Sequence, residues 1–360
     1  MAPIRILVDS FADAGLPNAQ MGNAREIITR LDPDLFHVSL FALGEPDSRI
    51  AARRNTRLIK LPDRRQTPRI LSEFLFGSHA LLFYIKSSPA SRWYLSLRKK
   101  WRDRRVAIGT VESQCDFHHL PDVSQEAVDL WTQTVLRCDR LYSNCEFVRR
   151  SLEHEYGAPS EIIPTGADTR FFTPRHDRPG NPRLRVLFAG SLCRRKHPEV
   201  LLSAAARFPQ VDFRIVGEGP LHGELRTRIG QERLGNVTLA GCLGPEQLRE
   251  EYRQADIFFF PSTFEGSPKV IVEAAACGLP VIVRDSYSPD TVIHGVSGFH
   301  SASNEEMFSF LKLLLENPVL RRQFGEAGRK HSVQFDWDQI ANQWATTFAA
   351  LAQPQLRSAS

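Results

Sequence analysis

Two glutamates stand eight positions apart in the stretch FEGSPKVIVEAAACGLPVI, and their surroundings differ. Glu265 is followed by Gly266, Ser267 and Pro268, whereas Glu273 lies inside an apolar run. Ser267 suits the N-cap of a helix and Pro268 its first position, because a serine oxygen accepts from a free backbone N–H and proline lacks one. The preceding DIFFFPS predicts a buried strand. We therefore expect Glu265 in a turn at the strand's carboxyl end and Glu273 about a turn and a half into the next helix.

Such a turn is suited to binding a phosphate. The backbone N–H groups from Gly266 to Lys269 would have no acceptor within the helix, and the helix dipole adds positive potential at this end. A phosphate flanked by two carboxylates indicates a nucleotide sugar, since each carboxylate can accept hydrogen bonds from hydroxyl groups. The alternative for Glu273 is an ordinary helix glutamate paired with a neighbouring lysine or arginine.

A second group of polar residues lies in the stretch LFAGSLCRRKHPEVLL. Gly190 and Ser191 end a predicted strand, and Arg194, Arg195 and Lys196 precede the next helix. Cations at the carboxyl end of a strand can hold a diphosphate, arginine as a planar fork and lysine as a point charge. The alternative is a set of solvated loop charges. Two phosphate-directed features in one predicted domain favour a shared ligand.

Strands rich in Val, Ile and Phe alternate with helices along most of the chain, which is typical of parallel sheets covered on both faces. Ligands bind such sheets at the carboxyl ends of their strands. The 360 residues suggest two doubly wound α/β domains. We expect a first domain over residues 1–172, a proline-rich linker over 173–184, a second domain over 185–334, and a closing helix and tail over 335–360. Residues 64–105 are expected to be mostly helical.

The second half of the chain resembles the donor domain of glycosyltransferase family 4, also called group 1, a large retaining group with the GT-B fold. Glu265 and Glu273 match the Glu-x7-Glu motif of that family. Arg195 and Lys196 match its Arg and Lys near a GSL…RK turn. Further pieces follow in the family's order: CDRLYSNCEFVRRSLEHEYG, IIPTGADTRFFTP, IVGEGP, VTLAGCL, IHGVSGF and FDWDQIANQWATTF. The resemblance covers roughly residues 138–350.

The resemblance implies a fold and an activity. The fold is two Rossmann-like domains facing a cleft, with the C-terminal helix crossing back to the first domain. The activity is retaining transfer of a sugar, of hexosyl type, from a nucleoside-diphosphate sugar to a hydroxyl group, with no metal and no cofactor required. The acceptor would be a glycan, a glycolipid or other lipid-linked compound, or a small molecule. The alternative is a non-catalytic nucleotide-sugar-binding relative, marked by loss of the paired glutamates or of the cations.

Each site residue takes its implied role from the motif that it matches. Glu265 would contact hydroxyls of the donor sugar, and Glu273 those of the ribose. Arg195 and Lys196 would neutralise the departing diphosphate, a step that needs charge stabilisation more than a strong base. The remaining donor-site residues are Gly190, Ser191, Gly241, Cys242, Leu243, Gly266, Ser267, Pro268 and Lys269. Among these, the main chain of 241–243 would meet the base.

The first half departs from the family's pattern. Many members have two glycines after the first strand, where this chain offers one, Gly22. Many also end a later strand in a His-Asp pair beside the sugar. The matching strand is VAIGTVESQCDFHH, which has Glu112 in the place of the histidine, with His118 and His119 a few residues later. We therefore take Glu112 as the candidate for the active site and keep the two histidines as alternatives.

Composition argues against several other classes. The six cysteines form no CxxC pair and no metal-ligand spacing, which indicates reduced thiols in the cytoplasm. The start MAPIRILVDSF has too short an apolar run for a signal peptide, and no window of about 18 residues is apolar throughout. The run GEGPLHG is one residue too long for the GxGxxG of dinucleotide-binding enzymes. We recognise no nucleic-acid-binding module and expect no nucleic-acid partner.

Positive charge is concentrated between residues 49 and 105. Sixteen lysines or arginines stand there against three acids, about +13, whereas the whole chain carries +5. The part RWYLSLRKKWRDRR, residues 92–105, interleaves Trp93, Tyr94 and Trp101 with its cations. Aromatic rings lie at the headgroup level of a bilayer, and lysines and arginines attract anionic lipid. The segment is either an interfacial helix on the inner face of a membrane or a solvated basic surface.

Overall fold

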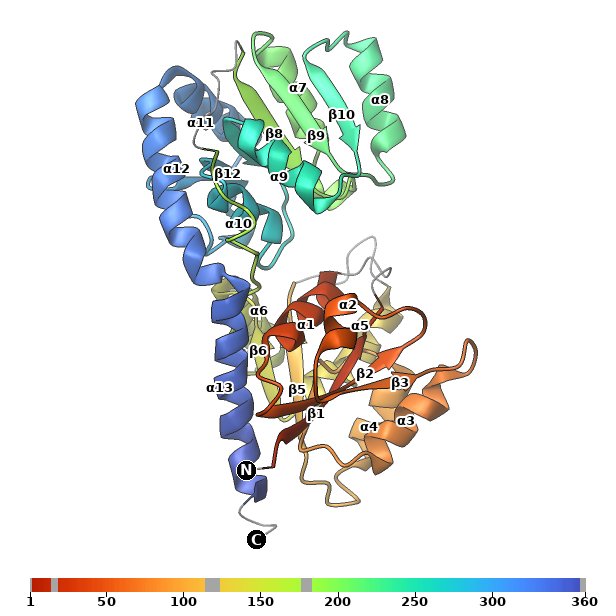
Figure 1. Ribbon diagram of the computed structural model, residues 1–360. Helices are drawn as coiled ribbons and strands as arrows, with labels where there is room; N and C mark the ends of the chain where they lie inside the picture. Colours follow the sequence, from red (N-terminus) through yellow and green to blue (C-terminus); the bar gives the residue numbers. More distant parts are fainter. Residues whose placement is uncertain (1, 14–18, 114–123, 176–182, 357–360) are drawn as a thin grey trace. The chain divides into compact units, whose positions relative to one another are not determined.

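The computed structural model describes residues 2–13, 19–113, 124–175 and 183–356 (Figure 1). The chain divides into two compact units. Unit 1 consists of Met1–Thr165 and Trp337–Ser360, and unit 2 of Gly166–Asp336. The predicted linker, residues 173–184, falls within unit 2 and in part outside the described residues.

Unit 1 is built on a parallel sheet. Its described residues form seven strands in the order β3-β2-β1-β4-β5-β6-β7. The strands are β1 (Ile4–Phe11), β2 (Phe36–Ala42), β3 (Thr56–Lys60), β4 (Leu81–Phe83), β5 (Val106–Val111), β6 (Arg140–Ser143) and β7 (Glu161–Ile162). The helices are α1 (Ala19–Arg30), α2 (Ser48–Ala52), α3 (Gln66–Phe76), α4 (Pro89–Leu97), α5 (Gln125–Thr132), the 3-10 turn η2 (Val135–Arg137), α6 (Glu146–Tyr156) and α13 (Trp337–Leu356).

Unit 2 has a second parallel sheet. Its described residues form six strands in the order β10-β9-β8-β11-β12-β13. The strands are β8 (Arg185–Ala189), β9 (Asp212–Val216), β10 (Val237–Gly241), β11 (Ile257–Phe260), β12 (Val281–Arg284) and β13 (Gly298–Ser301). The helical elements are η3 (Arg194–Lys196), α7 (Glu199–Arg207), α8 (His222–Gln231), α9 (Pro245–Gln254), α10 (Lys269–Ala276), η4 (Asp285–Tyr287), α11 (Asn304–Glu316), α12 (Pro318–Ser332) and η5 (Val333–Phe335). Both sheets confirm the doubly wound α/β class.

Apolar strands form the core of unit 2. All four residues of β11, Ile-Phe-Phe-Phe, are fully buried. A strand in the middle of a parallel sheet has helices over both faces and therefore no side that favours polar residues. Phe260 of β11 stacks against Phe188 of the neighbouring β8, with ring centroids 5.8 Å apart. This packing fixes β8 and β11 side by side, and the loops that leave their carboxyl ends carry the candidate site.

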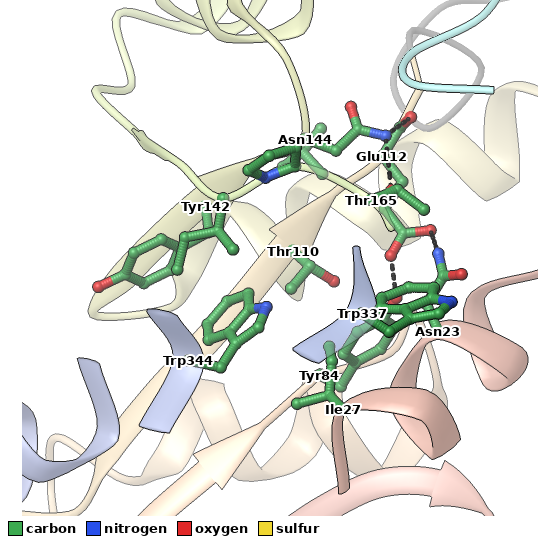
Figure 2. Close-up of a pocket in the computed structure, with 13 residues that line it drawn as sticks. Asn23, Ile27, Tyr84, Thr110, Glu112, Tyr142, Asn144, Thr165, Trp337 and Trp344 are labelled. Carbon is green, nitrogen blue, oxygen red and sulfur yellow. Dashed lines mark hydrogen bonds between the residues drawn. The ribbon is translucent and has the colours of Figure 1, made fainter. Parts of the chain in front are cut away.

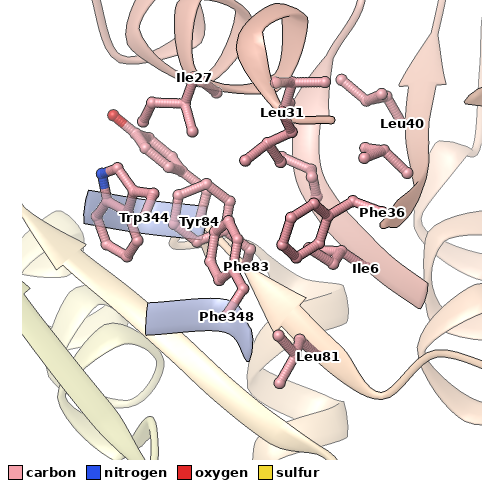
Figure 3. Close-up of a cluster of buried hydrophobic side chains, with 14 of the residues drawn as sticks. Ile6, Ile27, Leu31, Phe36, Leu40, Leu81, Phe83, Tyr84, Trp344 and Phe348 are labelled. Carbon is pink, nitrogen blue, oxygen red and sulfur yellow. The ribbon is translucent and has the colours of Figure 1, made fainter. Parts of the chain in front are cut away.

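The last helix packs on unit 1 (Figure 1). Trp344 and Phe348 of α13 are buried, and their ring centroids lie 4.7 Å and 4.8 Å from that of Phe83 in β4 (Figure 3). Trp344 also contacts Tyr142 of β6, with centroids 4.9 Å apart. The prediction that the C-terminal helix returns to the first half of the chain is confirmed.

Two helix ends agree with the sequence. Ser124 caps α5 by accepting a hydrogen bond from the Ala127 N–H. Gly157 ends α6 in the left-handed conformation, φ +59°, which glycine adopts without steric cost.

Two local predictions are wrong. Residues 64–105 are not mostly helical, because β4 lies inside them, between α3 and α4. Its three residues are all buried and too few to show a strand period, so the sequence does not distinguish this strand from a buried helical segment. Ser267 does not cap α10. That helix begins at Lys269 with the extended Pro268 as its N-cap, which leaves Ser267 one residue too early.

Candidate active site

The order of the unit 2 sheet brings two distant loops together. The chain adds β9 and β10 on one side of β8 and then adds β11 on the other side. In open parallel sheets, ligands bind at such a reversal of strand order, outside the carboxyl ends of the strands. The segment after β8 contains Arg195 and Lys196, and the segment after β11 contains Glu265.

Backbone contacts hold these two segments in register. The Thr263 N–H donates to the Arg195 carbonyl oxygen at 3.0 Å. The Ser262 hydroxyl oxygen lies 3.1 Å from the same oxygen, and Ser262 is fully buried. The main chain of Arg195 is therefore held by the main chain of Thr263 and by the buried Ser262.

Glu265 lies at the centre of this junction. Its Oε1 atom accepts from Arg195 Nη1 at 2.9 Å and from the Ser262 hydroxyl at 2.6 Å, and Lys196 Nζ lies 2.5 Å away. Glu265 and Lys196 are each about 8% exposed. The predicted carboxylate and both predicted cations thus form one cluster, and Lys196 also lies over the Phe260 ring, 4.8 Å from its centroid.

The hydrogen bonds of Glu265 all converge on one oxygen. Among the described residues no contact to its Oε2 atom is found, whereas Oε1 has three donors. A carboxylate has about four lone-pair directions, so Oε2 keeps its capacity to accept from a hydroxyl group. The arrangement holds the side chain in one orientation and leaves one oxygen for a ligand.

Glu273 lies apart from this cluster, on α10. Its Oε2 accepts a hydrogen bond from the hydroxyl of Tyr252 in α9 at 3.0 Å, and Tyr252 is fully buried. Burial raises the pKa of the Glu273 carboxyl, while the Lys269 charge and the Tyr252 hydroxyl act in the opposite direction. In the structure its hydrogen-bond partner is a tyrosine, not a lysine or arginine.

The turn before α10 also fits an anion. Gly266 and Ser267 are buried, and no acceptor for their backbone N–H groups is found in the described part of the chain. The Ser267 hydroxyl is buried without a partner among the same residues. Pro268 lacks an N–H, and Lys269 begins the helix. Buried donors without acceptors are costly, so this turn is suited to a group that supplies oxygen atoms.

The glycines along this edge allow close contact between loops. Gly190 follows β8 at φ +154°, and a Cβ on Gly217, after β9, would lie 1.9 Å from the Gly190 carbonyl oxygen. A Cβ on Gly219 would lie 2.6 Å from the Leu192 carbonyl oxygen. Real Cβ atoms do not approach backbone so closely, so only glycine fits. Ser191, between these contacts, is exposed.

The three residues predicted to contact the base lie at the carboxyl end of β10, the strand that pairs with β9 on the side away from β8. Gly241 is the last residue of β10, at φ +70°, and its carbonyl oxygen accepts from the Gly217 N–H at 2.8 Å. Cys242 is exposed and Leu243 half-buried. The structure therefore gathers the predicted residues of unit 2 at the carboxyl ends of β8, β10 and β11, and Glu273 on the helix after β11.

Glu112 lies in unit 1, directly after β5, in a small pocket (Figure 2). One carboxylate oxygen accepts from Asn23 Nδ2 at 2.9 Å, and the other accepts from the Tyr84 hydroxyl. The Glu112 carbonyl oxygen accepts from Asn144 Nδ2 at 2.7 Å. The cavity measures about 20 Å³, enough for about one water molecule, and Trp337 of α13 forms part of its wall.

This pocket presents acceptors. The Oδ1 atoms of Asn23 and Asn144 are buried and have no partner among the described residues. The nitrogen atom of each amide donates a hydrogen bond to Glu112. The amide oxygen is on the opposite side of each group and remains an acceptor. At this pocket size the two amide oxygens suit one small hydroxyl donor, a water molecule or a single hydroxyl group of a ligand.

Sequence reasoning missed Asn23, Tyr84 and Asn144. Tyr84 follows β4 in the left-handed conformation, φ +63°, which is unusual for a bulky residue and typical of functional sites. Gly22 lies in the first turns of α1, next to Asn23, and not in a loop before the helix. His118 and His119 lie outside the described residues. Of the three, Asn23 alone had a local indication in the sequence, because it is next to Gly22, which was already a candidate from the sequence.

Two further findings limit what the described part of the chain contains. It has no group of three or more His, Cys, Asp or Glu side chains that could hold a metal ion. None of its helices combines the length and apolar character needed to cross a membrane.

Comparison with known proteins gives the family. The family described as "Glycosyl transferases group 1" matches residues 171–331. Unit 2 belongs to the group 1 glycosyl transferases. Its β8–β11 junction, with Arg195, Lys196 and Glu265, therefore lies within the part that the family shares.

Curated relatives include D-inositol 3-phosphate glycosyltransferases. That of Segniliparus rotundus is 31% identical over 240 residues, which cover 61% of this chain and 54% of the relative. That of Corynebacterium jeikeium is 35% identical over 239 residues, 58% of this chain and 57% of the relative. The chain thus spans about half the length of the curated relatives it matches.

Solved structures extend the likeness to nearly the whole chain. Sucrose-phosphate synthase from Thermosynechococcus elongatus has a TM-score of 0.78 at 20% identity, covering 99% of this chain and 100% of that one. Anabaena HepE in complex with UDP has a TM-score of 0.74 at 17% identity, covering 97% and 100%. The fold of the chain is GT-B, as predicted.

Proposed function

We propose that this protein is a retaining glycosyltransferase that moves a hexosyl group from a nucleoside-diphosphate sugar to a hydroxyl group. The observation that carries the proposal is the contact of Glu265 with Arg195 and Lys196 at the β8–β11 junction. It combines two cations for a diphosphate with a carboxylate that keeps one oxygen for sugar hydroxyls. Membership of unit 2 in the group 1 glycosyl transferases supports it.

The donor would lie along the carboxyl edge of the unit 2 sheet. The loop after β10 is proposed for the base and the loop after β11 for the sugar, and three strand spacings, roughly 14 Å, separate them. The loop after β8, with Arg195 and Lys196, lies between the two. Base, diphosphate and sugar follow in the same order in a nucleoside-diphosphate sugar. Glu273 would accept from the ribose hydroxyls.

Charge stabilisation would drive the transfer. The bond between the anomeric carbon and the β-phosphate oxygen breaks, and the acceptor oxygen bonds to the same face of that carbon. The departing phosphate takes the hydroxyl proton. Arg195 and Lys196 would stabilise the charge that develops on the diphosphate, an effect worth most at a site shielded from water. Glu265 would hold the sugar through Oε2.

Uridine diphosphate sugars are the first donors to test. Anabaena HepE, which shares the fold, was solved with UDP and with UDP-glucose. The acceptor is proposed to be a glycan, a lipid-linked compound or a small molecule with several hydroxyls, bound near Glu112 and the open oxygens of Asn23 and Asn144. We propose that the reaction takes place in the cytoplasm or on the inner face of its membrane, without a metal ion or cofactor.

A hydrolysis screen tests the proposed function. The protein is incubated with UDP, GDP and ADP sugars, and released nucleotide is measured. We expect release from one class, reduced at least roughly tenfold in Arg195→Ala because the leaving charge is less compensated. Arg194→Ala is the matched control, since Arg194 is exposed and, in the described part of the chain, the cations that contact Glu265 are Arg195 and Lys196.

The outcomes separate the proposal from its alternative. Tight nucleotide-sugar binding by calorimetry without any release, with or without added polyol acceptors, would indicate a binding protein of the same fold. Equal activity of Arg195→Ala and wild type would show that the cluster is not the site.

A further inference from the structure

We propose that the outward side of α4 and the turn after it, residues 92–104, is a docking face for an anionic phospholipid bilayer. We further propose that the adjoining cavity takes the phosphate of one lipid headgroup. This proposal depends on the proposed function in one respect: membrane docking would bring the enzyme close to a lipid-linked acceptor. Its observations are independent of the donor site.

The structure divides the basic segment into buried and exposed residues. Tyr94 and Arg98 are buried, and Arg98 Nη1 pairs with Asp139 at 2.6 Å. Arg105 pairs with Asp103. These cations hold unit 1 together and are not available to a membrane. The segment is also not one helix, since α4 ends at Leu97.

The remaining residues form one exposed side. Trp93 is 56% exposed and Trp101 54%, which is unusual for the largest apolar side chain. The exposed cations among them are Arg92, Lys99, Lys100, Arg102 and Arg104. Residues three or four apart share a helix face, and hydrogen bonds from Lys100 to Leu97 and from Trp101 to Arg98 continue the helical path past Leu97.

A cavity of about 500 Å³ adjoins this side, within the size range of small-molecule pockets. Ser96 and Lys99 line it from α4 and the following turn, and Arg137 lines it from η2. Arg137 Nη1 reaches the Ser96 hydroxyl at 3.5 Å. All of these precede β5 or β6, so the cavity lies at the amino ends of those strands, the edge opposite Glu112.

The lining carries a net positive charge. Its two carboxylates, Asp103 and Asp139, are paired with Arg105 and Arg98. Lys99 and Arg137 have no ion pair among the described residues. Ser96, Lys99 and Arg137 are exposed at this cavity. Two cations without an ion pair among the described residues, together with a hydroxyl, are suited to a phosphate group.

A bilayer fits this face better than a nucleic acid or an acidic protein. Tryptophan is the residue that favours the headgroup region, and here two of them project from a cationic side. The attraction of lysine and arginine to an anionic surface acts over about 8 Å at physiological salt, so exposed cations next to membrane-inserted tryptophans would contribute to binding.

Co-sedimentation with vesicles tests the docking face. Wild type should bind phosphatidylcholine vesicles that contain phosphatidylglycerol, should not bind phosphatidylcholine alone, and should be released by high salt. Lys99→Glu/Lys100→Glu and, separately, Trp93→Ala/Trp101→Ala should each weaken partitioning roughly tenfold or more. Arg226→Glu/Arg322→Glu, two exposed cations of unit 2, makes the same charge change and should bind as wild type does.

A separate comparison of vesicles tests the headgroup cavity. At equal surface charge, wild type should prefer phosphatidylglycerol vesicles to vesicles charged with oleate, which has no phosphate, and Arg137→Gln should lose that preference. The absence of a preference in wild type would overturn the headgroup site. No binding to anionic vesicles at low salt, or tighter binding to RNA through the same residues, would overturn the docking face.

Nucleotide-sugar hydrolysis measured without vesicles separates this proposal from the proposed function. It should be unchanged in all these variants, because none of the substituted residues lies at the donor site. Binding to vesicles without any nucleotide-sugar hydrolysis would contradict the proposed enzymatic function but would still support the docking face.

Discussion

Glu265 and Glu273 differ in what the surrounding protein does to each carboxylate. Glu265 is held by two cations and a hydroxyl, all on Oε1, so its charge is compensated. Glu273 is half-buried, its carboxylate accepts from a tyrosine hydroxyl, and desolvation raises its pKa. The contacts of Glu265 hold its carboxylate in place and leave one oxygen to accept from hydroxyl groups. The charged form of Glu273 is desolvated, which lowers the stability of the folded protein.

Glu265→Gln should separate binding from transfer. Glutamine can still accept from Ser262, but it removes the charge that neutralises Arg195 and Lys196, so UDP affinity should be unchanged or higher. Transfer should fall roughly tenfold to a hundredfold because the sugar is less well oriented. Calorimetry with UDP and steady-state kinetics measure the two effects. A parallel loss of UDP affinity would mean that Glu265 acts by holding the loops together.

Glu273→Gln should stabilise the protein in a pH-dependent way. Burial raises the folded pKa above its ordinary value of 4.5, so above that pH the folded protein bears the cost of a buried charge and its stability falls as pH rises through the folded pKa. Glutamine removes this cost. The melting temperature should therefore exceed that of wild type at pH 8 and converge with it near pH 4.

The same substitution should weaken nucleotide binding, since the ribose loses a charged acceptor. A loss of about 1–3 kcal/mol is expected for polar groups left with poorer partners. A variant with wild-type UDP affinity and no change in its pH–stability profile would show that Glu273 is a surface-like helix residue.

At the scale of elements, the site depends on loops that touch through their backbones. The segments after β8 and β9 approach so closely at Gly190 and Gly217 that no side chain fits between them. The segments after β8 and β11 are joined through the Arg195 carbonyl oxygen. The edge of the sheet thus behaves as one connected surface, in which the cations cannot move without the loops.

Gly217→Ala should damage both stability and nucleotide binding. Its Cβ would lie 1.9 Å from the Gly190 carbonyl oxygen, at φ +135°, so the two loops must separate. We expect a loss of roughly 2 kcal/mol or more in unfolding free energy, together with weaker UDP binding. Gly223→Ala is the control. It lies in α8 with nothing within 4 Å of the new Cβ, and it should stabilise by about 0.5–1 kcal/mol.

At the scale of the whole molecule, the chain leaves unit 1 after Thr165 and returns to it at Trp337. The returning helix α13 contributes Trp344 and Phe348 to the unit 1 core (Figure 3). Each unit has its own sheet and its own core, so each can respond separately to mutation and to ligand.

Trp344→Ala should lower the stability of unit 1 alone. The substitution empties a space between Phe83 and Tyr142, and a buried tryptophan of this kind is worth about 3–5 kcal/mol. Calorimetry should show one transition shifted downward. If UDP binds unit 2 as proposed, it should stabilise the other transition by about 2.7 kcal/mol at a hundredfold excess over its Kd. A single transition that moves under both changes would contradict independent units.

The sequence by itself was enough for the α/β class, most strands and helices, the α5 and α6 ends, and the family motif. These features are written in short windows: a run such as IFFF predicts a buried strand, and a serine or glycine marks a helix end within a few residues. The same windows failed at β4, which is too short to show a period, and at Ser267, where the extended Pro268 shifts the helix start.

Only the tertiary structure decided which polar groups meet. Arg195 reaches Glu265 across 70 positions, because the reversal of strand order places β8 beside β11. Asn23 reaches Glu112 across 89, and Arg98 is withdrawn from the basic surface by Asp139, 41 residues away. Such pairs depend on strand order and on the direction in which each strand ends. No short window of sequence carries that information, since it arises when distant strands pair.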